Sequence, residues 1–226
     1  NKFNYRLVSH FELIIPISKN IVEDFKLPLE KCMIFQGGCT EIAFKMQKLC
    51  QEKKNKLLPI AVFAGRLEKY NGIDKLINFW NKYITDFELH VYGSGSYESQ
   101  VIKKAKANSK IKFFGLVSDK EIFQVQLNSA VNICLRYSIG LNQNYFFPSK
   151  IFNLMSAPGT TVINSFNNLP IEMTKYCKIL ENDFSNLKLI LNESLLFNNI
   201  NYRKRLNWLN SHASWNLLIK EIKIKL

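Results

Sequence analysis

The feature that most constrains the fold is an alternation of short apolar runs with segments of helical spacing, which begins at residue 59. Apolar runs of four to eight residues bounded by turn residues are typical of buried strands, and residues at i, i+3 and i+4 spacing indicate helices. The expected strands are 59–65, 87–93, 111–115, 131–136 and 160–164, and the expected helices are 72–84, 97–108, 118–130 and 148–157. Strands that alternate with helices of this length form a parallel sheet covered on both faces. The sequence therefore predicts an α/β, doubly wound, Rossmann-like domain.

The two ends of the chain give different patterns. Segments 11–18 and 31–38 have the composition of strands around a helix near 18–25, so we expect residues 1–56 to be the end of a preceding domain or an interdomain linker. Residues 57–226 are expected to form the main domain, with helices after residue 183. The last segment, 214–226, carries an apolar stripe with lysines opposite, which is typical of core or interdomain packing; contact with a membrane surface is the alternative.

The net charge restricts the kinds of partner. The chain has 31 Lys and Arg residues against 18 Asp and Glu residues, a formal charge of +13, which favours phosphates, nucleic acid or an acidic membrane surface. The basic residues are spread over several clusters and are not interleaved with aromatic residues in one patch. No nucleic-acid-binding motif is recognisable either, so the sequence disfavours a nucleic-acid partner.

The cysteines and histidines do not predict a metal site. The five cysteines include no C-x-x-C pair, and the three histidines lack zinc-ligand spacing. We interpret the cysteines as free thiols of a reducing compartment. No apolar run approaches the ~20 residues that span a bilayer. The expected location is cytoplasmic, with peripheral contact at the inner face of the plasma membrane left open.

Several loops follow the expected strands where ligands bind. In an open parallel sheet the ligand site lies beyond the carboxyl ends of the strands, here residues 65–66, 93–95, 115–117 and 136–147. Pro148, Ser149 and Lys150 then precede an apolar helix, whose first N–H groups are unpaired and favour a phosphate. The alternative is an ordinary helix start with a solvated lysine.

A nicotinamide or flavin site is disfavoured by the loop at Gly93-Ser94-Gly95. The dinucleotide fingerprint requires a third glycine three residues after Gly95, and that position is Glu98. No acidic residue follows at the spacing expected for a ribose-binding carboxylate.

Five segments in register resemble one family. They are "FAGRLEKYNGIDKLI", "ELHVYGSGSYE", "IKFFGLVSDKEIFQVQLNSAVNICLR", "FFPSKIFNLMSAPGTTVIN" and "ASWNLLIKEI". In order and spacing they are similar to the C-terminal, donor-binding domain of retaining GT-B glycosyltransferases of the family-four, "group 1" kind. The segment "ELIIPISKNIVEDF…IFQGG" resembles the end of that family's N-terminal domain and its linker.

The resemblance implies a glycosyltransferase that takes a sugar from a UDP- or GDP-linked donor without a cofactor or metal. Fixed positive charge and N–H donors would stabilise the diphosphate as the glycosidic bond breaks. The residues it implies for catalysis are Arg66, Lys69 and Lys150. Those it implies for donor binding are Gly65, Arg66, Asn71, Gly93, Ser94, Gly95, Leu116, Val117, Pro148, Ser149, Lys150 and Asn153. Ser138, Ile139 and Gly140 are expected in the loop facing the sugar and phosphates.

The chain departs from the family pattern at its acidic and basic positions. Two family glutamates fall on Tyr145 and Asn153, and the family lysine after Arg66 falls on Asn71. Lys69, two positions early, either substitutes for that lysine by a different loop path or is a solvated loop lysine. The family's Gly-x-Pro becomes Gly159-Thr160-Thr161. The amide of Asn153 has an acceptor oxygen but not the charge of a glutamate.

These departures leave two functions open. One is a glycosyltransferase acting on a glycan or lipid-linked acceptor in surface polysaccharide or lipopolysaccharide synthesis, with contact to an anionic membrane. The other is a non-catalytic nucleotide-sugar-binding subunit that complements a separate N-terminal-domain chain.

Overall fold

The computed structural model describes residues 5–8, 10–45, 57–84, 86–137, 140, 142–196 and 199–226. Within these residues lies a six-stranded sheet in the order β3-β2-β1-β4-β5-β6, and every pair of neighbouring strands is parallel. The strands are β1 (Leu58–Ala64), β2 (Glu88–Tyr92), β3 (Ile111–Gly115), β4 (Ser129–Cys134), β5 (Thr160–Asn164) and β6 (Cys177–Leu180). The doubly wound parallel sheet expected from the sequence is confirmed.

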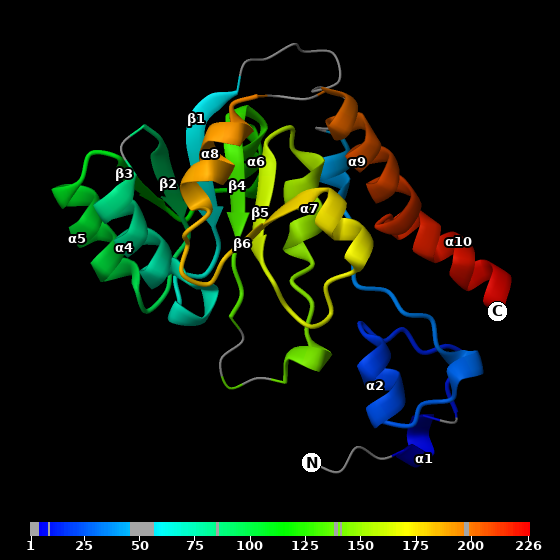
Figure 1. The fold of residues 1–226 in the computed structure, drawn as a ribbon. Helices are drawn as coiled ribbons and strands as arrows, with labels where there is room; N and C mark the ends of the chain where they lie inside the picture. Colours follow the sequence, from blue (N-terminus) through cyan, green and yellow to red (C-terminus); the bar gives the residue numbers. More distant parts are fainter. Residues whose placement is uncertain are drawn as a thin grey trace.

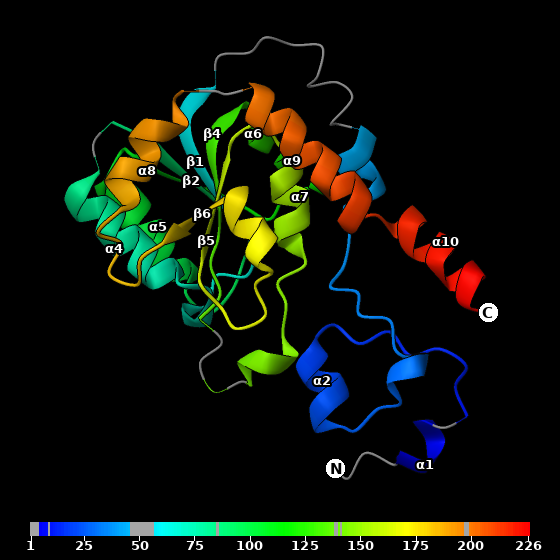
Figure 2. The ribbon, with the colours of Figure 1, turned by 45° about the vertical axis from the view of Figure 1, so that its right-hand side comes forward.

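Helices cover both faces of this sheet (Figures 1 and 2). One hydrophobic cluster joins the sheet to α4 (Ile73–Tyr83), α5 (Glu98–Ala107) and α8 (Leu187–Ser194). The other joins it to α6 (Asp119–Asn128), α7 (Lys150–Ser156) and α9 (Asn199–His212). Trp80 of α4 is fully buried and its indole N–H donates to the carbonyl of Phe87, so its polar end is satisfied inside the core.

The strand order fixes where a ligand can bind. The chain runs outward from β1 to β3, returns through α6 and continues from β4 on the other side of β1. The carboxyl ends of β1 and β4 therefore diverge at the switch point, where open α/β sheets have their crevice.

Local sequence signals account for the ends of the helices, but they did not indicate one strand and one 3₁₀ turn. The expected capping box is present, since Ser118 accepts from the N–H of Glu121 and the Glu121 carboxylate accepts from the N–H of Ser118. Gly72 begins α4 in the left-handed region, with φ of +67°. The sequence pattern did not indicate the 3₁₀ turn η4 (Ile171–Lys175) or β6, a strand of four residues.

The strands expected in the amino-terminal segment are not present. Residues 11–18 and 31–38 do not form strands of a sheet; they share a single parallel bridge between Ile14 and Cys32. Two short segments with so few hydrogen bonds do not make an independent sheet. The expected helix is present as α2 (Lys19–Asp24), capped by Ser18, between the turns α1 (Tyr5–Val8) and η1 (Leu29–Lys31). Residues 41–45 are helical as well.

The last helix, α10 (Trp215–Lys225), lies beside the linker that follows the amino-terminal segment. The N–H of Cys39 donates to the carbonyl of Ala213, and the rings of Phe35 and Trp215 are 5.1 Å apart. The expected apolar stripe is only partly covered, because Leu218 is buried whereas Trp215 and Ile219 are about half exposed.

None of the helices that the structure describes is long and apolar enough to cross a membrane. Four of the five cysteines fall within the described ranges, and all four are free thiols: Cys32, Cys39, Cys134 and Cys177.

Candidate functional site

The loops after β1, β2 and β3 are held together by backbone hydrogen bonds that continue the strand ladder. The N–H of Gly65 donates to the carbonyl of Tyr92, and the N–H of Gly93 donates to that of Gly115. A Cβ on Gly93 would lie 1.9 Å from the carbonyl oxygen of Gly65, and one on Gly95 would lie 2.6 Å from that of Leu67. Gly93 and Gly95 thus have a packing role, because only glycine lets these loops approach so closely.

A cavity of about 320 Å³ lies beyond the ends of β1, β2 and β3. Seven of the residues expected to bind the donor line it: Gly65, Arg66, Gly93, Ser94, Leu116, Val117 and Lys150. Tyr92, Asp119 and Ile122 complete its walls. Leu116 is 77% exposed, so its apolar side chain is open to a ligand in this cavity.

A second cavity, of about 130 Å³, lies at the switch point between the ends of β1 and β4. Gly65, Arg66, Asn71, Pro148 and Lys150 of the expected set line it. A further cation, Arg136, also lines this cavity, and no Asp or Glu is among its lining residues. Unpaired cations that share a cavity favour an anionic ligand.

Lys150 borders both cavities and so marks their junction. A Cβ on Gly65 would lie 2.9 Å from the Lys150 Nζ, so the lysine reaches from the start of α7 to the end of β1. Within the described part of the chain its ammonium has no hydrogen-bond or ion-pair partner. Burial lowers the pKa of Lys150, and the nearby Cys134 and Asp119 oppose that shift.

The start of α7 is less open than the sequence suggested. The N–H of Ser149 already donates to the carbonyl of Phe147, and the Ser149 Cβ lies against Gly37 of the linker. The free N–H at this helix start is that of Lys150, which has no backbone acceptor among the described residues.

Two other expected residues lie away from these cavities. Lys69 is exposed at the start of η2 (Lys69–Asn71) and lines neither of them. Asn153 lines a neighbouring cavity of about 150 Å³, where its Oδ1 accepts from the N–H of Thr40 at 2.9 Å. Its acceptor oxygen is thus already used by the linker.

The loop between β4 and α7 is described in part. Ser138 and Ile139 lie outside the described residues, and Gly140 is exposed. Tyr145, in η3 (Gln143–Tyr145), donates from its hydroxyl to Asp24 at 2.7 Å and thereby ties the loop to α2.

Comparison with known proteins shows the family of the chain. Residues 46–163, more than half of the 226-residue chain, match the family described as glycosyl transferases group 1. The chain belongs to this family. No curated protein sequence matches it.

Solved structures share the fold of this group 1 glycosyl transferase chain at low sequence identity. A trehalose-6-phosphate protein from E. coli bound with UDP-2-fluoro glucose superposes with a TM-score of 0.68 at 13% identity, over 98% of this chain and 62% of that one. Sucrose-phosphate synthase from Thermosynechococcus elongatus gives 0.67 at 13% identity, over 96% and 58%. The GtfA/B complex gives 0.64 at 16% identity, over 98% and 47%. The chain therefore spans less than two thirds of each of these relatives.

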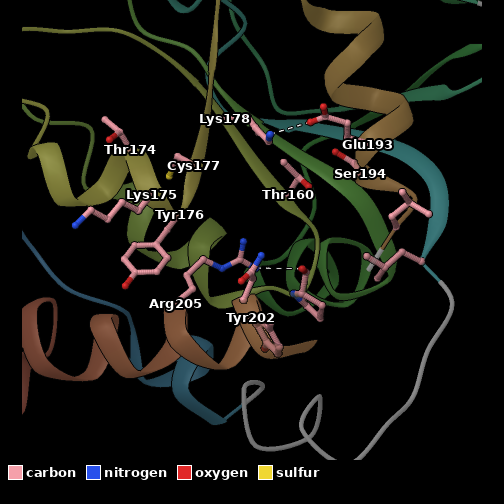
Figure 3. Close-up of a pocket in the computed structure, with 14 residues that line it drawn as sticks. Thr160, Thr174, Lys175, Tyr176, Cys177, Lys178, Glu193, Ser194, Tyr202 and Arg205 are labelled. Carbon is pink, nitrogen blue, oxygen red and sulfur yellow. Dashed lines mark hydrogen bonds and ion pairs between the residues drawn. The ribbon is translucent and has the colours of Figure 1, made fainter. Parts of the chain in front are cut away.

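A larger cavity, of about 380 Å³, lies at the opposite, amino-terminal end of the strands (Figure 3). Two of its three basic residues have partners already: Lys178 pairs with Glu193 at 2.8 Å, and Arg205 donates to the carbonyls of Ala157, Pro158 and Gly159. Arg205 closes the carboxyl end of α7, where free carbonyls favour a cation. The switch-point cavity differs, because Arg66, Arg136 and Lys150 line it without an Asp or Glu.

Sequence reasoning placed Arg136 in a loop where a ligand is expected but assigned it no role, and it missed Asp119. Arg136 ends the expected strand 131–136, and Asp119 follows the helix cap at Ser118. Their only sequence signal was this position directly after an apolar run or at a helix start, which does not distinguish them from solvated charges.

Proposed function

We propose that this chain is the donor-binding part of a glycosyltransferase that takes a sugar from a nucleotide-diphosphate sugar. The observation that carries the proposal is the switch-point cavity, which Arg66 and Lys150 both line and which has no carboxylate in its lining. In the transfer, the bond between the anomeric carbon and the diphosphate oxygen breaks, and a hydroxyl oxygen of the acceptor bonds to that carbon while its proton passes to an oxygen of the leaving diphosphate. The electron pair of the broken bond stays on the diphosphate, where fixed cations stabilise it.

The two cavities suggest how the donor lies. The base and ribose would occupy the larger cavity, with the base against Leu116 and Val117. The diphosphate would occupy the junction at Lys150, between the two cavities. Each charge-assisted hydrogen bond to a phosphate oxygen contributes about 1.5–3 kcal/mol.

Titration calorimetry with UDP, GDP and ADP tests donor binding. We expect one or more of the diphosphates to bind the wild-type chain, and Arg66→Met to weaken that binding about tenfold or more. Arg203→Met is the matched control, because Arg203 is an exposed arginine of α9 remote from both cavities. If no nucleoside diphosphate binds the wild type, the proposal is wrong.

We also propose that the donor is held without a metal or other cofactor. The support is chemical: the side-chain cations of the cavity offer the diphosphate the positive charge that a metal ion would otherwise supply. Diphosphate binding should then be the same in EDTA as in Mg²⁺. Binding that depends on Mg²⁺ would contradict this part.

A specific observation favours the alternative of a binding subunit that complements a second chain. Tyr145 and Asn153, at the positions where the resemblance predicts glutamates, hold the amino-terminal segment through Asp24 and Thr40. The surface of that segment also exposes large apolar side chains, among them Leu7, Phe11 and Leu29.

Sugar transfer or donor hydrolysis is measured for the chain alone and with products of neighbouring genes. Activity only in a pair would favour the subunit.

The acceptor we propose is a glycan or lipid-linked sugar of surface polysaccharide or lipopolysaccharide synthesis, reached in the cytoplasm at an anionic membrane. The support is the net charge of +13, together with Lys220 and Lys223 beside exposed apolar residues on α10. Sedimentation with vesicles tests it: we expect binding to vesicles with anionic lipid and none to neutral ones.

A further inference from the structure

Arg136 leaves β4 in a fixed direction. Its N–H donates to the Oδ1 of Asn164 at 2.6 Å, and its carbonyl accepts from the Nδ2 of the same side chain at 2.7 Å. Asn164, the last residue of β5, is 97% buried, because only 3% of its surface is exposed. The Asn164 side chain thus pairs with both backbone polar groups of Arg136 and fixes the backbone at the switch point. The fixed backbone in turn sets the direction of the Arg136 side chain.

Two aromatic rings and one amide hold the guanidinium. Its central carbon lies 4.4 Å from the ring centre of Tyr70 and 4.5 Å from that of Phe146. Such stacking on ring faces stabilises a cation. One terminal nitrogen donates to the Oδ1 of Asn71 at 3.1 Å, so the guanidinium is held from the η2 side as well.

Most of the donors of this guanidinium remain available. A guanidinium has five N–H donors, and Asn71 accepts from one terminal nitrogen. Nε is buried without a hydrogen-bond partner among the described residues. A buried, unpaired donor costs about 1–3 kcal/mol, so this guanidinium suits a ligand that accepts hydrogen bonds.

The partner must be an anion. Arg136 shares the switch-point cavity with Arg66 and Lys150, and no Asp or Glu lines that cavity. Arg66 follows β1 and Arg136 follows β4, so the loop after each of these two strands contributes one arginine to the lining of the cavity. An anion with several oxygens along its length, such as a diphosphate, suits cations from two loops.

We infer that Arg136 binds the diphosphate of the donor from the β4 side, as a further cation of the site. This inference rests on the proposed function. It also explains the neutral residue at position 71, where the resemblance predicted a lysine: Asn71 anchors Arg136, which brings the positive charge from another loop.

A purely structural role makes a different prediction. If Arg136 only joined η2 to the loop after β4, its loss would lower stability and would weaken nucleoside and diphosphate binding alike. Arg136→Met keeps an unbranched, polarisable side chain between the two rings and removes the charge and the N–H donors. Arg203→Met makes the same change on an exposed face of α9.

Titration calorimetry compares both variants with the wild type, using UDP and GDP with uridine and guanosine as the probes without phosphate. We expect Arg136→Met to weaken diphosphate binding about tenfold to a hundredfold, to leave nucleoside binding within about twofold, and to reduce the salt dependence of diphosphate binding. Urea unfolding confirms that the variant is folded. Arg203→Met should change none of these quantities.

Two results would overturn the inference while leaving the proposed function intact. One is diphosphate binding by Arg136→Met equal to that of the wild type, with Arg66→Met weakened. The other is an equal loss for nucleoside and diphosphate. If the wild type binds no diphosphate, the proposed function fails and this inference fails with it. If Arg136→Met does not fold, Arg136→Lys replaces it, and a selective loss of diphosphate affinity is again the expected result.

Discussion

Replacing Lys150 by methionine should have opposite effects on stability and on donor binding. Burial lowers the pKa of Lys150, and its ammonium has no internal partner within the described chain. The charged form is therefore disfavoured in the folded state, whereas methionine fills a similar volume without charge. We expect Lys150→Met to raise the free energy of unfolding at pH 7.

The stability advantage of Lys150→Met should depend on pH. The pKa of Lys150 is lower in the folded chain than the ordinary 10.5, so the unfolded state binds more protons between the two values. Lys150 therefore reduces the free energy of unfolding of the wild type at neutral pH. This loss recovers as the pH rises from the pKa of Lys150 in the folded chain towards 10.5. The advantage of Lys150→Met in urea unfolding should therefore shrink over that range.

The effect on binding follows from the position of the ammonium at the junction of the two cavities. Since no internal partner competes for it, the diphosphate gains one full charge-assisted hydrogen bond, worth about 1.5–3 kcal/mol. At about 1.4 kcal/mol per tenfold change, calorimetry should show UDP or GDP binding weakened about tenfold to a hundredfold, with nucleoside binding kept.

Lys103→Met, an exposed lysine of α5, is the matched control and should alter neither property. The reasoning would be refuted if Lys150→Met lowered stability and bound the diphosphate as tightly as the wild type. That pair of results would mean that the ammonium is satisfied internally and faces no anion.

Three further predictions concern the fold. Arg205 is 7% exposed and donates to three backbone carbonyls, so Arg205→Met should lower the free energy of unfolding in urea by about 3 kcal/mol, whereas Arg203→Met should stay within about 0.5 kcal/mol of the wild type. Gly93→Ala should lower it by about 4 kcal/mol or prevent folding, because the new Cβ would lie 1.9 Å from a carbonyl oxygen of the loop after β1; a soluble variant of wild-type stability would contradict this. Burial raises the pKa of Cys39 and of Cys177 to about 12, so neither thiol should react with a disulfide reagent at pH 8 until the chain unfolds, as mass spectrometry would show.

Local patterns predicted the regular part of the fold because they depend on neighbours in sequence. The buried residues of α4, Ile73, Leu76, Ile77 and Trp80, follow helical spacing, and the capping box at Ser118 spans three residues. The prediction for the amino-terminal segment failed for the same reason. The apolar residues around Ile14 have strand composition, but a strand needs a neighbour, and among the described residues Ile14 forms a single bridge, with Cys32.

The site depends on contacts that no local pattern contains. The Arg136–Asn71 hydrogen bond joins residues 65 apart, and the Asn153–Thr40 hydrogen bond joins residues 113 apart. Resemblance to a family could locate Arg66 and Lys150 because those positions lie in recognisable segments. It could not show that Asn71 anchors an arginine from another loop, since that contact exists only once β1 and β4 are adjacent.

The strand order is thus the physical cause of the site. Because β4 pairs with β1 and not with β3, the loops that carry Arg66, Arg136 and Lys150 converge on one crevice. The cations there repel one another, and no Asp or Glu lines the switch-point cavity, although Asp119 lies near Lys150 in the larger one. The fold holds its charges in place through backbone pairing, Asn164 and two aromatic rings. A site built in this way is preorganised: binding an anion relieves repulsion that the sheet has already enforced, and most of the affinity should come from charge and not from closure. Diphosphate affinity that stayed constant as the salt concentration rose would show that this account of the crevice is wrong.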